Sequence, residues 1–585
     1  MRHGHTLTLV AGTAIATASL ICTAWAAGAG ASARVAAAAP AQVRVDQVGY
    51  TPGSTKVAYA MLPGQVGQVS FTVSGARGVV FRGRSARDLG SWNSAYRAVY
   101  QLDFTGLTRA GDYRITIRAG AASAVSPGFA VAPANVLYHR LVLNGVRYFT
   151  SERDGGDVVH SVLDRRPANL TDRRAVVYHD PRYDSNDNLL GTFHRIGGPV
   201  NVNGGWFDAG GGYEKFAYTG SYADGLLLLA ARDSPGRYPT LLPEAHFGLR
   251  WLGKLWRPKA KVLYIQVGIG NGNASNTIQG DYNFWFRPQA EDRMDVKPGG
   301  HPGPSAYYVK YRPVFEAAPP GHKMSPEFAG RFAADFGLGA QLSARGDRHH
   351  ARRLLSLARG IFAMAKTRHV GAIVTTFPHD YYPGTEWKSA MLWGAAEIAL
   401  ADESLHAPAA RVRADLAVAA HWARAYIAQG HPAGGDTLNL YDNGAIGEAE
   451  LLQAMRETHG KPVIAPHTLL ADMAAQLRVG EHLAKGDPFP HCKQSEIANL
   501  AGSLTGKGDI QVGATSDGPS GIGNFVGLGT VQGMKACRAG HFKPFNTKTT
   551  GYEDNVVSWP SVEPADDYTA VSTLAFALAA AQSGH

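Results

Sequence analysis

The stretch "APANVLYHRLVLNGVRYF", residues 132–149, marks the point at which the pattern of this 585-residue chain changes. Upstream of it, short runs rich in β-branched and aromatic residues alternate with turns. Within it, apolar residues such as Val142, Val146 and Phe149 recur at spacings of three and four, which is typical of a helix packed on one face. The stretch therefore separates a β-rich part of the chain from a helical part.

The upstream part, residues 43–134, predicts a small β-sandwich. Its seven apolar runs are separated by Gly and Pro: "VRVDQVGY", "KVAYAML", "QVSFTVSG", "GVVFRG", "YRAVYQLDF", "GDYRITIRAG" and "GFAVAP". Short strands at such regular spacing indicate a sandwich. No run carries a cluster of chemically active side chains, so we expect a supporting module.

The downstream part, residues 135–585, predicts an all-helical domain. Helical spacing recurs in eleven runs: 137–149, 221–233, 244–256, 326–344, 352–366, 386–401, 408–429, 448–455, 468–484, 496–504 and 568–581. Long loops rich in Gly, Pro and aromatic residues join them, and loops of that length in a compact domain are usually functional. We expect a helical barrel with its site built from loops at one end.

The first 42 residues have the pattern of a secretory signal peptide followed by an Ala-rich lead. "MRHGH" is a short basic start, "LTLVAGTAIATASLICTAWA" is apolar, and small-residue cleavage sites follow. A membrane anchor is the alternative. Export would leave Cys492 and Cys537 as an even pair in an oxidising compartment, so a disulfide between them is expected.

Composition excludes several classes of protein. The chain is 45% hydrophobic and 18% charged, which predicts a well-packed globular protein rather than disorder. Removing residues 1–42 deletes Arg2 and Arg34 and no acid, so the net charge falls from +10 to +8. That charge is mild for the size, and no Lys/Arg run with interleaved aromatics occurs. Nucleic acid is therefore not an expected partner.

One stretch, "GGWFDAGGGYEKF" at residues 204–216, places the single aspartate Asp208 among five glycines. Glycine permits tight turns and close backbone approach. Trp206 and Tyr213 carry flat faces that are suited to stacking on a sugar ring. The alternative is a surface turn with buried aromatic rings.

Four blocks in this order together resemble the secreted glycoside hydrolases of family 9, which include many cellulases. They are "VRVDQVGYTP", "GGWFDAG", "VLYIQVGIGNGN" with "GDYNFWFRPQAEDR", and "VEPADDYTA". The resemblance covers the whole chain after the signal segment. It implies an immunoglobulin-like module followed by an (α/α)6 barrel, which has twelve helices.

Glycosidic bonds are cleaved by two carboxyl groups, and in inverting enzymes a water molecule fits between the base and the anomeric carbon. Glu563 is expected to be the general acid, because an apolar surround and the nearby Asp566 and Asp567 would raise its pKa. The resemblance places the family's acid at this residue. The structural alternative is that the Glu563 carboxylate is favoured at the N-terminus of the following helix by the helix dipole.

The base is where the chain departs from the family pattern. Family members usually carry Asp-Ala-Gly-Asp, whose second aspartate is the main base, but here Gly211 occupies that position. Asp208 matches the first aspartate and is the expected base. Glu214, brought nearer by a loop one residue longer, and the absence of any working base are the two alternatives.

Sugar contacts are expected from Trp206, Tyr213, Tyr282, Trp285 and Tyr568, although a core position is the alternative for the aromatic rings. The loop "HDYYPGTE", residues 379–386, is a further candidate for the cleft lining. Tyr282 stands where family members usually have a histidine, and the His-His-Arg segment of many cellulases is missing. The sequence therefore leaves open whether the substrate is cellulose.

The sequence thus predicts a secreted, inverting glycoside hydrolase that acts on a β-linked glucan or a related oligosaccharide. The alternatives are a non-catalytic carbohydrate-binding protein and an exo-acting β-glucosaminidase of the same family. No cofactor or zinc site is expected; a structural calcium ion held by loop oxygens is the one metal left open. We expect a monomer with no membrane contact after signal cleavage.

Overall fold

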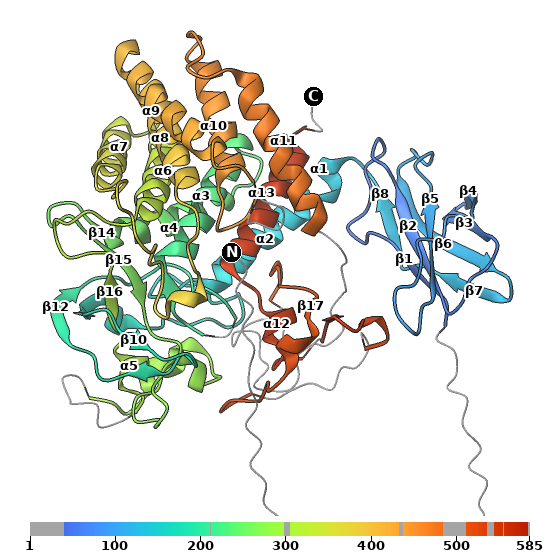
Figure 1. Cartoon of the computed structure of the whole chain (residues 1–585), viewed down its shortest axis with the longest axis horizontal. Helices are drawn as coiled ribbons and strands as arrows, with labels where there is room; N and C mark the ends of the chain where they lie inside the picture. The colour runs from blue at the N-terminus through green and yellow to red at the C-terminus, as the bar shows by residue number, and fades with distance from the viewer. Residues whose placement is uncertain are drawn as a thin grey trace, which may run out of the picture. The chain divides into compact units, whose positions relative to one another are not determined.

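The computed structural model describes residues 40–210, 212–297, 305–431, 437–483, 511–534, 543–553 and 555–582. The predicted Cys492–Cys537 disulfide, the helix expected at 496–504 and nearly all of the predicted signal segment lie outside these residues. Figure 1 shows the β-rich module in blue and the helical domain from cyan to red.

The β-rich module is a sandwich of two sheets. One sheet has the strand order β1-β2-β5; the other has the order β4-β3-β6-β7, with β8 also paired to β6. The strands are β1 (Gln42–Arg44), β2 (Val57–Leu62), β3 (Val69–Gly75), β4 (Gly78–Ser85), β5 (Ala98–Asp103), β6 (Gly111–Ala119), β7 (Ala122–Val125) and β8 (Phe129–Val131). Alternate residues such as Val69, Phe71 and Val73 point into the shared core. The predicted sandwich is confirmed.

Ten helices of 14 to 19 residues form the described part of the second domain. They are α2 (His139–Glu152), α3 (Ala217–Asp233), α4 (Leu241–Leu255), α6 (Pro326–Ser343), α7 (Arg348–Phe362), α8 (Lys388–Ser404), α9 (Ala409–Ile427), α10 (Gly444–Glu457), α11 (Pro466–Leu483) and α13 (Asp566–Gln582). Each of the ten predicted runs that fall within the described residues forms one of these helices. Short helices α1 (Ala134–Leu137), α5 (Tyr307–Lys310) and α12 (Trp559–Val562) supplement them.

The helices fall into two layers. α3, α6 and α8 pack in sequence against one another and are buried on nearly all sides. α7 buries only the stripe of Ala351, Leu354, Leu355, Ala358 and Ile361, which is the spacing of an outer helix. This double layer agrees with the predicted helical barrel.

Glycine brings α6 and α8 into close contact. A Cβ atom added at Gly330 would lie 2.3 Å from the backbone of Ala390, and one added at Gly394 would lie 2.4 Å from the carbonyl oxygen of Gly330. Neither position tolerates a side chain. The Gly residues in these runs therefore set the distance between the inner helices.

The helical domain also contains a sheet that the sequence analysis does not predict. Its strand order is β12-β9-β16-β15-β13, with β14 paired to β15. The strands are β9 (Ala175–Tyr178), β12 (Arg195–Val200), β13 (Lys215–Phe216), β14 (Trp256–Arg257), β15 (Val262–Val267) and β16 (Val314–Glu316). Two further sheets have two strands each: one pairs β10 (Arg182–Tyr183) with β11 (Leu189–Leu190), and the other pairs β17 (Ser520–Gly521) with β18 (Thr550–Gly551). The domain is therefore helical with a sheet of six short strands.

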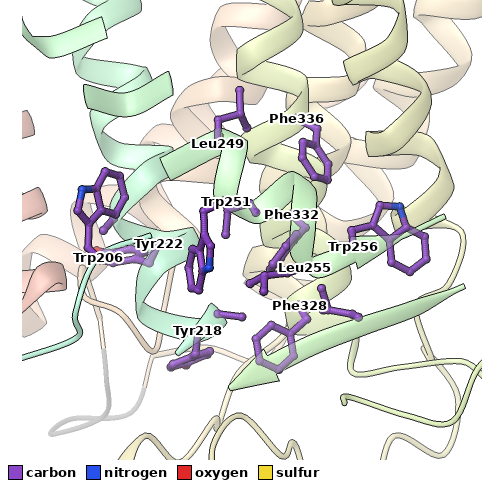
Figure 2. Packing of buried hydrophobic residues seen from close by; sticks show 14 of the residues in the cluster. Trp206, Tyr218, Tyr222, Leu249, Trp251, Leu255, Trp256, Phe328, Phe332 and Phe336 are labelled. Atoms are coloured by element: carbon purple, nitrogen blue, oxygen red, sulfur yellow. The ribbon is translucent and has the colours of Figure 1, made fainter. Parts of the chain in front are cut away.

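Large aromatic rings fill the core beside this sheet, as Figure 2 shows for the region between α3, α4 and α6. Trp251 on α4 is fully buried and its indole N–H donates to the carbonyl of Val202. Gly205 has a φ of +82°, and a Cβ there would lie 2.4 Å from the Trp251 ring. The glycines that begin the 204–216 stretch thus serve a tight turn against this tryptophan.

Among the residues that the structure describes, none of the helices combines the length and the hydropathy that crossing a membrane requires.

Candidate active site

Asp208 lies in the loop that precedes β13 and α3. Its side chain is 6% exposed, and its carboxylate accepts hydrogen bonds from two hydroxyl groups. Thr219, in the first turn of α3, donates to Oδ1, and Tyr382, from the loop before α8, donates to Oδ2 over 2.7 Å. The backbone N–H of Asp208 donates to the carbonyl of Glu214, which closes the loop. The carboxylate is thus fixed by two distant segments.

The protonation of Asp208 is set by two opposing effects. Burial raises the pKa of Asp208 to about 6, while the hydrogen bonds from Thr219 and Tyr382 favour the charged form and limit that rise. A carboxyl group with this pKa is ionised at neutral pH but still basic enough to accept a proton. Its position and its pKa are therefore suited to general-base catalysis.

The backbone of residues 208–210 pairs with the segment that follows Glu563. Ala209 and Ala565 form an antiparallel bridge. The N–H of Gly210 donates to the carbonyl of Pro564 over 3.0 Å, and the N–H of Asp566 donates to the carbonyl of Asp208 over 3.0 Å. The two predicted catalytic carboxyl groups consequently extend from neighbouring backbone segments.

Glu563 is half-buried and directly follows α12. Burial is the main cause that raises the pKa of Tyr282 well above its ordinary value, and the charges of both Glu563 and Asp208 add to the rise. The same two carboxyl groups contribute, after burial, to the raised pKa of Tyr382. The charges of Asp208 and Glu563 therefore both act on these two tyrosines.

Glu214 does not fit the role of base. Its side chain is buried, and Cβ atoms added at Gly212 or Gly270 would lie 2.2 and 2.5 Å from its two carboxyl oxygens. Burial, followed by repulsion from Asp281, raises the pKa of Glu214 well above its ordinary value. The group is thus enclosed, and its raised pKa favours the neutral form, which leaves Asp208 as the better candidate.

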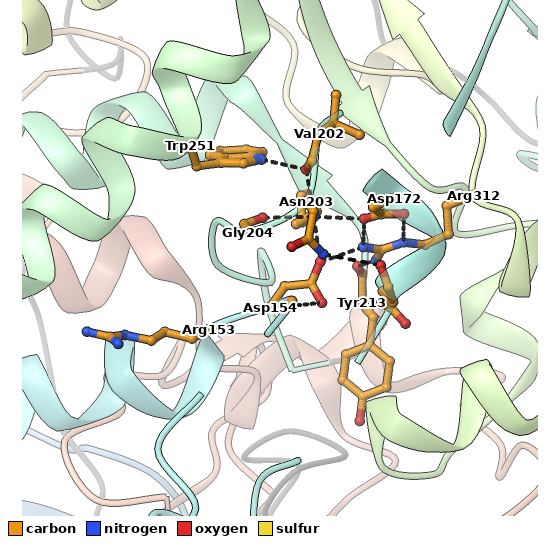
Figure 3. A network of polar contacts seen from close by, with 12 residues as sticks. Arg153, Asp154, Asp172, Val202, Asn203, Gly204, Tyr213, Trp251 and Arg312 are labelled. Carbon is orange, nitrogen blue, oxygen red and sulfur yellow. Dashed lines mark hydrogen bonds and ion pairs between the residues drawn. The ribbon is translucent and has the colours of Figure 1, made fainter. Parts of the chain in front are cut away.

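A buried ion cluster holds the loop that carries Asp208. Figure 3 shows the guanidinium of Arg312 between the carboxylates of Asp172 and Asp154, at 2.5 and 2.8 Å. Lys215 binds the same two carboxylates at 2.9 and 2.5 Å and also donates to the carbonyl of Gly204. Arg312 further donates to the carbonyl of Tyr213. Both ends of the 204–216 stretch are therefore tied to one cluster.

The described residues contain no group of three or more His, Cys, Asp or Glu side chains arranged to hold a metal ion.

Family models match both parts of the chain. The model described as glycosyl hydrolase family 9 matches residues 138–441, which is more than half of the chain. The model of the cellulase N-terminal immunoglobulin-like domain matches residues 38–121. The chain belongs to glycosyl hydrolase family 9. The resemblance inferred from the four sequence blocks is thereby confirmed.

Similar proteins of known sequence or structure carry family 9 names. Endoglucanase C of Cellulomonas fimi is 25% identical over 247 residues, which are 38% of this chain and 21% of that protein. A metagenome-derived family 9 endoglucanase has a TM-score of 0.60 at 20% identity, with 92% and 99% of the two chains covered. A thermostable endoglucanase from Alicyclobacillus acidocaldarius has a TM-score of 0.52 at 16% identity, with 93% and 100% covered. The chain matches about a fifth of its curated relative, while the structural matches show a shared fold.

Three of the five expected sugar-contact residues lie in the core of this family 9 domain, which corrects that expectation. Trp206 is 2% exposed, and its indole N–H donates to Glu244 over 2.9 Å. Tyr213 is buried against Phe207, and its hydroxyl donates to the carbonyl of Phe286. Trp285 is fully buried. None of the three presents a ring face to a substrate.

Tyr282 and Tyr568 remain as candidate sugar contacts. Tyr282 is half-buried, and its ring centroid lies 5.8 Å from that of Tyr381. Tyr568, in the first turn of α13, is 39% exposed and close enough to Glu563 for that charge to contribute to its raised pKa, after burial and two aspartates. Both rings border the pair of carboxyl groups.

The sequence analysis does not identify Thr219 and Tyr382 as partners of Asp208. The loop 379–386 is a candidate for the cleft lining, but nothing in its sequence indicates a bond to an aspartate 174 positions away. Thr219 follows Asp208 by eleven positions and lies inside a helical pattern. Only the fold brings these groups together.

The β-sandwich module contacts the segment that leads to Glu563. Trp92 donates to the carbonyl of Phe545 over 2.7 Å, and Asn93 donates to the carbonyls on either side of Phe545. The Tyr96 ring stacks on the Phe545 ring with centroids 5.5 Å apart. Phe545 in turn packs against the small cluster of Tyr552 and Val562, and Val562 is the residue before the predicted acid. The β-sandwich module thus contacts residues of the helical domain that precede the predicted acid Glu563.

Proposed function

We propose that this protein is a secreted, inverting glycoside hydrolase that cleaves a β-linked glucan or a related oligosaccharide. The observation that carries this proposal is the antiparallel pairing of residues 208–210 with 564–566. The proposal is supported by the charges of Asp208 and Glu563, which both contribute, after burial, to the raised pKa of Tyr282 and of Tyr382. Two carboxyl groups facing one sugar are the common requirement of glycosidases.

In the proposed reaction, Asp208 accepts a proton from a water molecule whose oxygen forms a bond with the anomeric carbon. The bond between that carbon and the glycosidic oxygen breaks, and its electron pair stays on the oxygen, which takes the proton of Glu563. Because water attacks from the side opposite the leaving group, the configuration inverts. Proton exchange with solvent then restores both carboxyl groups.

The substrate proposal follows the names of similar proteins. The curated relative and several structural neighbours are endoglucanases, and one neighbour was solved with a cellobiose-like isofagomine. Tyr282 and Tyr568 supply ring faces near the carboxyl pair. We therefore propose a β-linked glucose polymer or oligomer as the first substrate class to test.

Gly211 in place of the family's usual second aspartate motivates the second candidate function, a carbohydrate-binding protein without catalysis. The environment of Asp208 favours hydrolysis. A binding protein would not need a buried carboxylate held by two hydroxyl groups. With one aspartate instead of two, we expect slower activation of water.

A reducing-end assay on β-1,4-glucan, β-1,3-glucan and glucosaminide oligosaccharides tests the proposal. Proton NMR of the first product should show the α-anomer, since the substrate is β-linked. Release of reducing ends that is absent from Asp208→Ala supports hydrolysis at this site. Substrate binding without any release of reducing ends supports the non-catalytic alternative.

Secretion is proposed from the predicted signal segment at residues 1–42. Expression of the full chain in a secreting host should deliver a protein shortened near residue 42 to the medium, as N-terminal sequencing would show. A full-length product in the membrane fraction would favour the anchor instead.

A further inference from the structure

A second concave site lies on the sheet of the helical domain. It is a cavity of about 410 Å³ whose walls include His179, Asp180, Val262, Tyr264, Glu316 and Pro319. These residues come from β15 and β16 and from the segments that follow β9 and β16. Asp208 and Glu563 are not among its walls.

The strand register explains how the side chains of this cavity converge. Tyr264 on β15 is directly opposite Glu316 on β16, so both side chains extend from the same face of the sheet. Val262 is two residues before Tyr264 and shares that face. At the other end of β15, Val267 pairs with Lys215, close to the Asp208 loop. The cavity and the active site are therefore at opposite ends of one strand.

Tyr264 supplies a hydroxyl group to the cavity. The residue is only 7% exposed, and its hydroxyl forms no side-chain hydrogen bond within the described part of the chain. Its oxygen is not enclosed by protein atoms, so it opens toward the cavity rather than into the core. A ligand in the cavity can therefore form a hydrogen bond with it.

Two carboxyl groups share the cavity with Tyr264. Burial raises the pKa of Asp180 and the pKa of Glu316; the charge of Asp180 adds to the rise at Glu316, and His179 opposes both. Within the described parts of the chain, neither carboxyl group forms an ion pair or accepts a side-chain hydrogen bond. The cation that acts on the Tyr264 hydroxyl is Arg257 on β14, and it does not pair with Glu316. Asp180 and Glu316 therefore repel each other, and His179 opposes that repulsion.

We propose that this cavity binds a small ligand of monosaccharide size that carries a protonated amine. The ammonium group would donate to the carboxylates of Asp180 and Glu316 and so remove their mutual repulsion. A hydroxyl of the ligand would pair with Tyr264, and its apolar face would rest on Val262 and Pro319. The volume is at the lower end of small-molecule sites.

The charge of the ligand is the specific part of this proposal. A neutral sugar could accept the contacts with Tyr264 and the apolar wall, but it would leave both carboxylates without a cation. An amine that has been acetylated loses its charge and adds bulk. Glucosamine, N-acetylglucosamine and glucose are therefore matched probes that differ at one ring position.

Isothermal titration calorimetry of the full chain with these three sugars tests the proposal. Glucosamine should bind at least about tenfold more tightly than glucose or N-acetylglucosamine, because hydrogen bonds to a charged group contribute the difference. Glu316→Gln should weaken glucosamine binding about tenfold or more, and Tyr264→Phe should weaken it by a smaller factor. Asp208→Asn, which alters only the active site, should leave the affinity unchanged.

Equal affinity for the three sugars would overturn the proposal, and so would loss of glucosamine binding in Asp208→Asn, which would place the sugar in the active site. Unchanged binding in Glu316→Gln would also overturn it. If Glu316→Gln does not fold, as judged by circular dichroism, the exposed Asp180→Asn takes its place with the same expected loss. The outcome is independent of whether the protein hydrolyses glycosides.

Discussion

The hydroxyl of Tyr382 donates a hydrogen bond of 2.7 Å to a carboxylate oxygen of Asp208, although 174 positions separate the two residues. Together with Thr219, it stabilises the ionised form of a carboxyl group that burial would otherwise neutralise. The loop before α8 thereby controls the protonation of the proposed base. This contact gives the first prediction.

Tyr382→Phe should move the acidic limb of the pH–rate profile to higher pH. The pKa of Asp208 is about 6, and a base must be ionised, so kcat/KM should fall as the pH decreases below about 6. Loss of a bond that favours the charged form raises this pKa, and we expect a shift of about one pH unit. Tyr426→Phe is the matched control, because Tyr426 donates to the buried Asp442, whose pKa is also about 6. An unshifted limb in Tyr382→Phe would contradict the assignment of Asp208 as the base.

Glu563→Gln should lower turnover about 10²- to 10⁴-fold on substrates with poor leaving groups, since these need a proton donor. Dinitrophenyl glycosides, whose leaving group needs no proton, should be much less affected. The two rates are compared on the same enzyme preparation. An equal loss on both substrates would argue against Glu563 as the acid.

Asp208→Ala should abolish hydrolysis, and sodium azide should partly restore turnover because azide attacks the anomeric carbon without a base. The product to detect by NMR is the α-glycosyl azide. Glu214→Gln is the control: Glu214 is enclosed, and its raised pKa favours the neutral form that an amide resembles, so the amide should keep activity within a few-fold. If Glu214→Gln is inactive and Asp208→Ala is not, the roles of the two residues are reversed.

Asp172→Asn should lower the free energy of unfolding by about 3 to 5 kcal/mol, because it leaves Arg312 and Lys215 with one carboxylate in place of two. Although burial acts to raise it, Arg312 and Lys215 hold the pKa of Asp172 below its ordinary value. Its contribution is therefore present above the pKa of the unfolded state and is lost as the pH falls through the folded value.

Urea titrations of Asp172→Asn at pH 7 and near pH 3 measure this effect, and the difference from the parent protein should narrow at the lower pH. Asp164→Asn removes the exposed pair with Arg166 and should change stability by less than about 1 kcal/mol. Similar losses in the two variants would show that the buried cluster has no special role.

Tyr96→Ala and Phe545→Ala should be energetically coupled, since their rings stack at an interplanar angle of 7°. A double-mutant cycle on unfolding should give about 1 kcal/mol of coupling. Because Phe545 packs against the cluster of Tyr552 and Val562, we also expect each variant to lower kcat more than it raises KM. Full additivity of the two substitutions would show that the contact does not stabilise the protein.

Periodicity predicts most of the architecture because each long element repeats its own pattern. The stripe of α7 and the alternation of β3 are visible in the sequence, and both elements form as expected. The sheet of the helical domain was missed, since β13 and β14 have two residues each and acquire partners only through distant strands. Strands this short do not show the alternation of apolar and polar residues from which a strand is predicted.

The candidate site was predictable only in part. Asp208 and Glu563 stand in motifs, so the resemblance indicates them. The burial of Trp206 was not predictable, because it depends on Gly248 of α4, where a Cβ atom would lie 2.2 Å from the Trp206 ring. A local sequence cannot indicate which glycine on another helix will make room for a ring.

The bridge between Ala209 and Ala565 also fixes when during synthesis the site can form. The backbone partner of residues 208–210 emerges from the ribosome more than 350 residues after them. The ion cluster that holds the loop around Asp208 can form earlier, because Asp172 and Arg312 both precede residue 564. Until residue 564 is made, however, this loop lacks its backbone partner beside Glu563. The proposed base therefore gains its neighbour on the side of Glu563 only once residues 564–566 are in place.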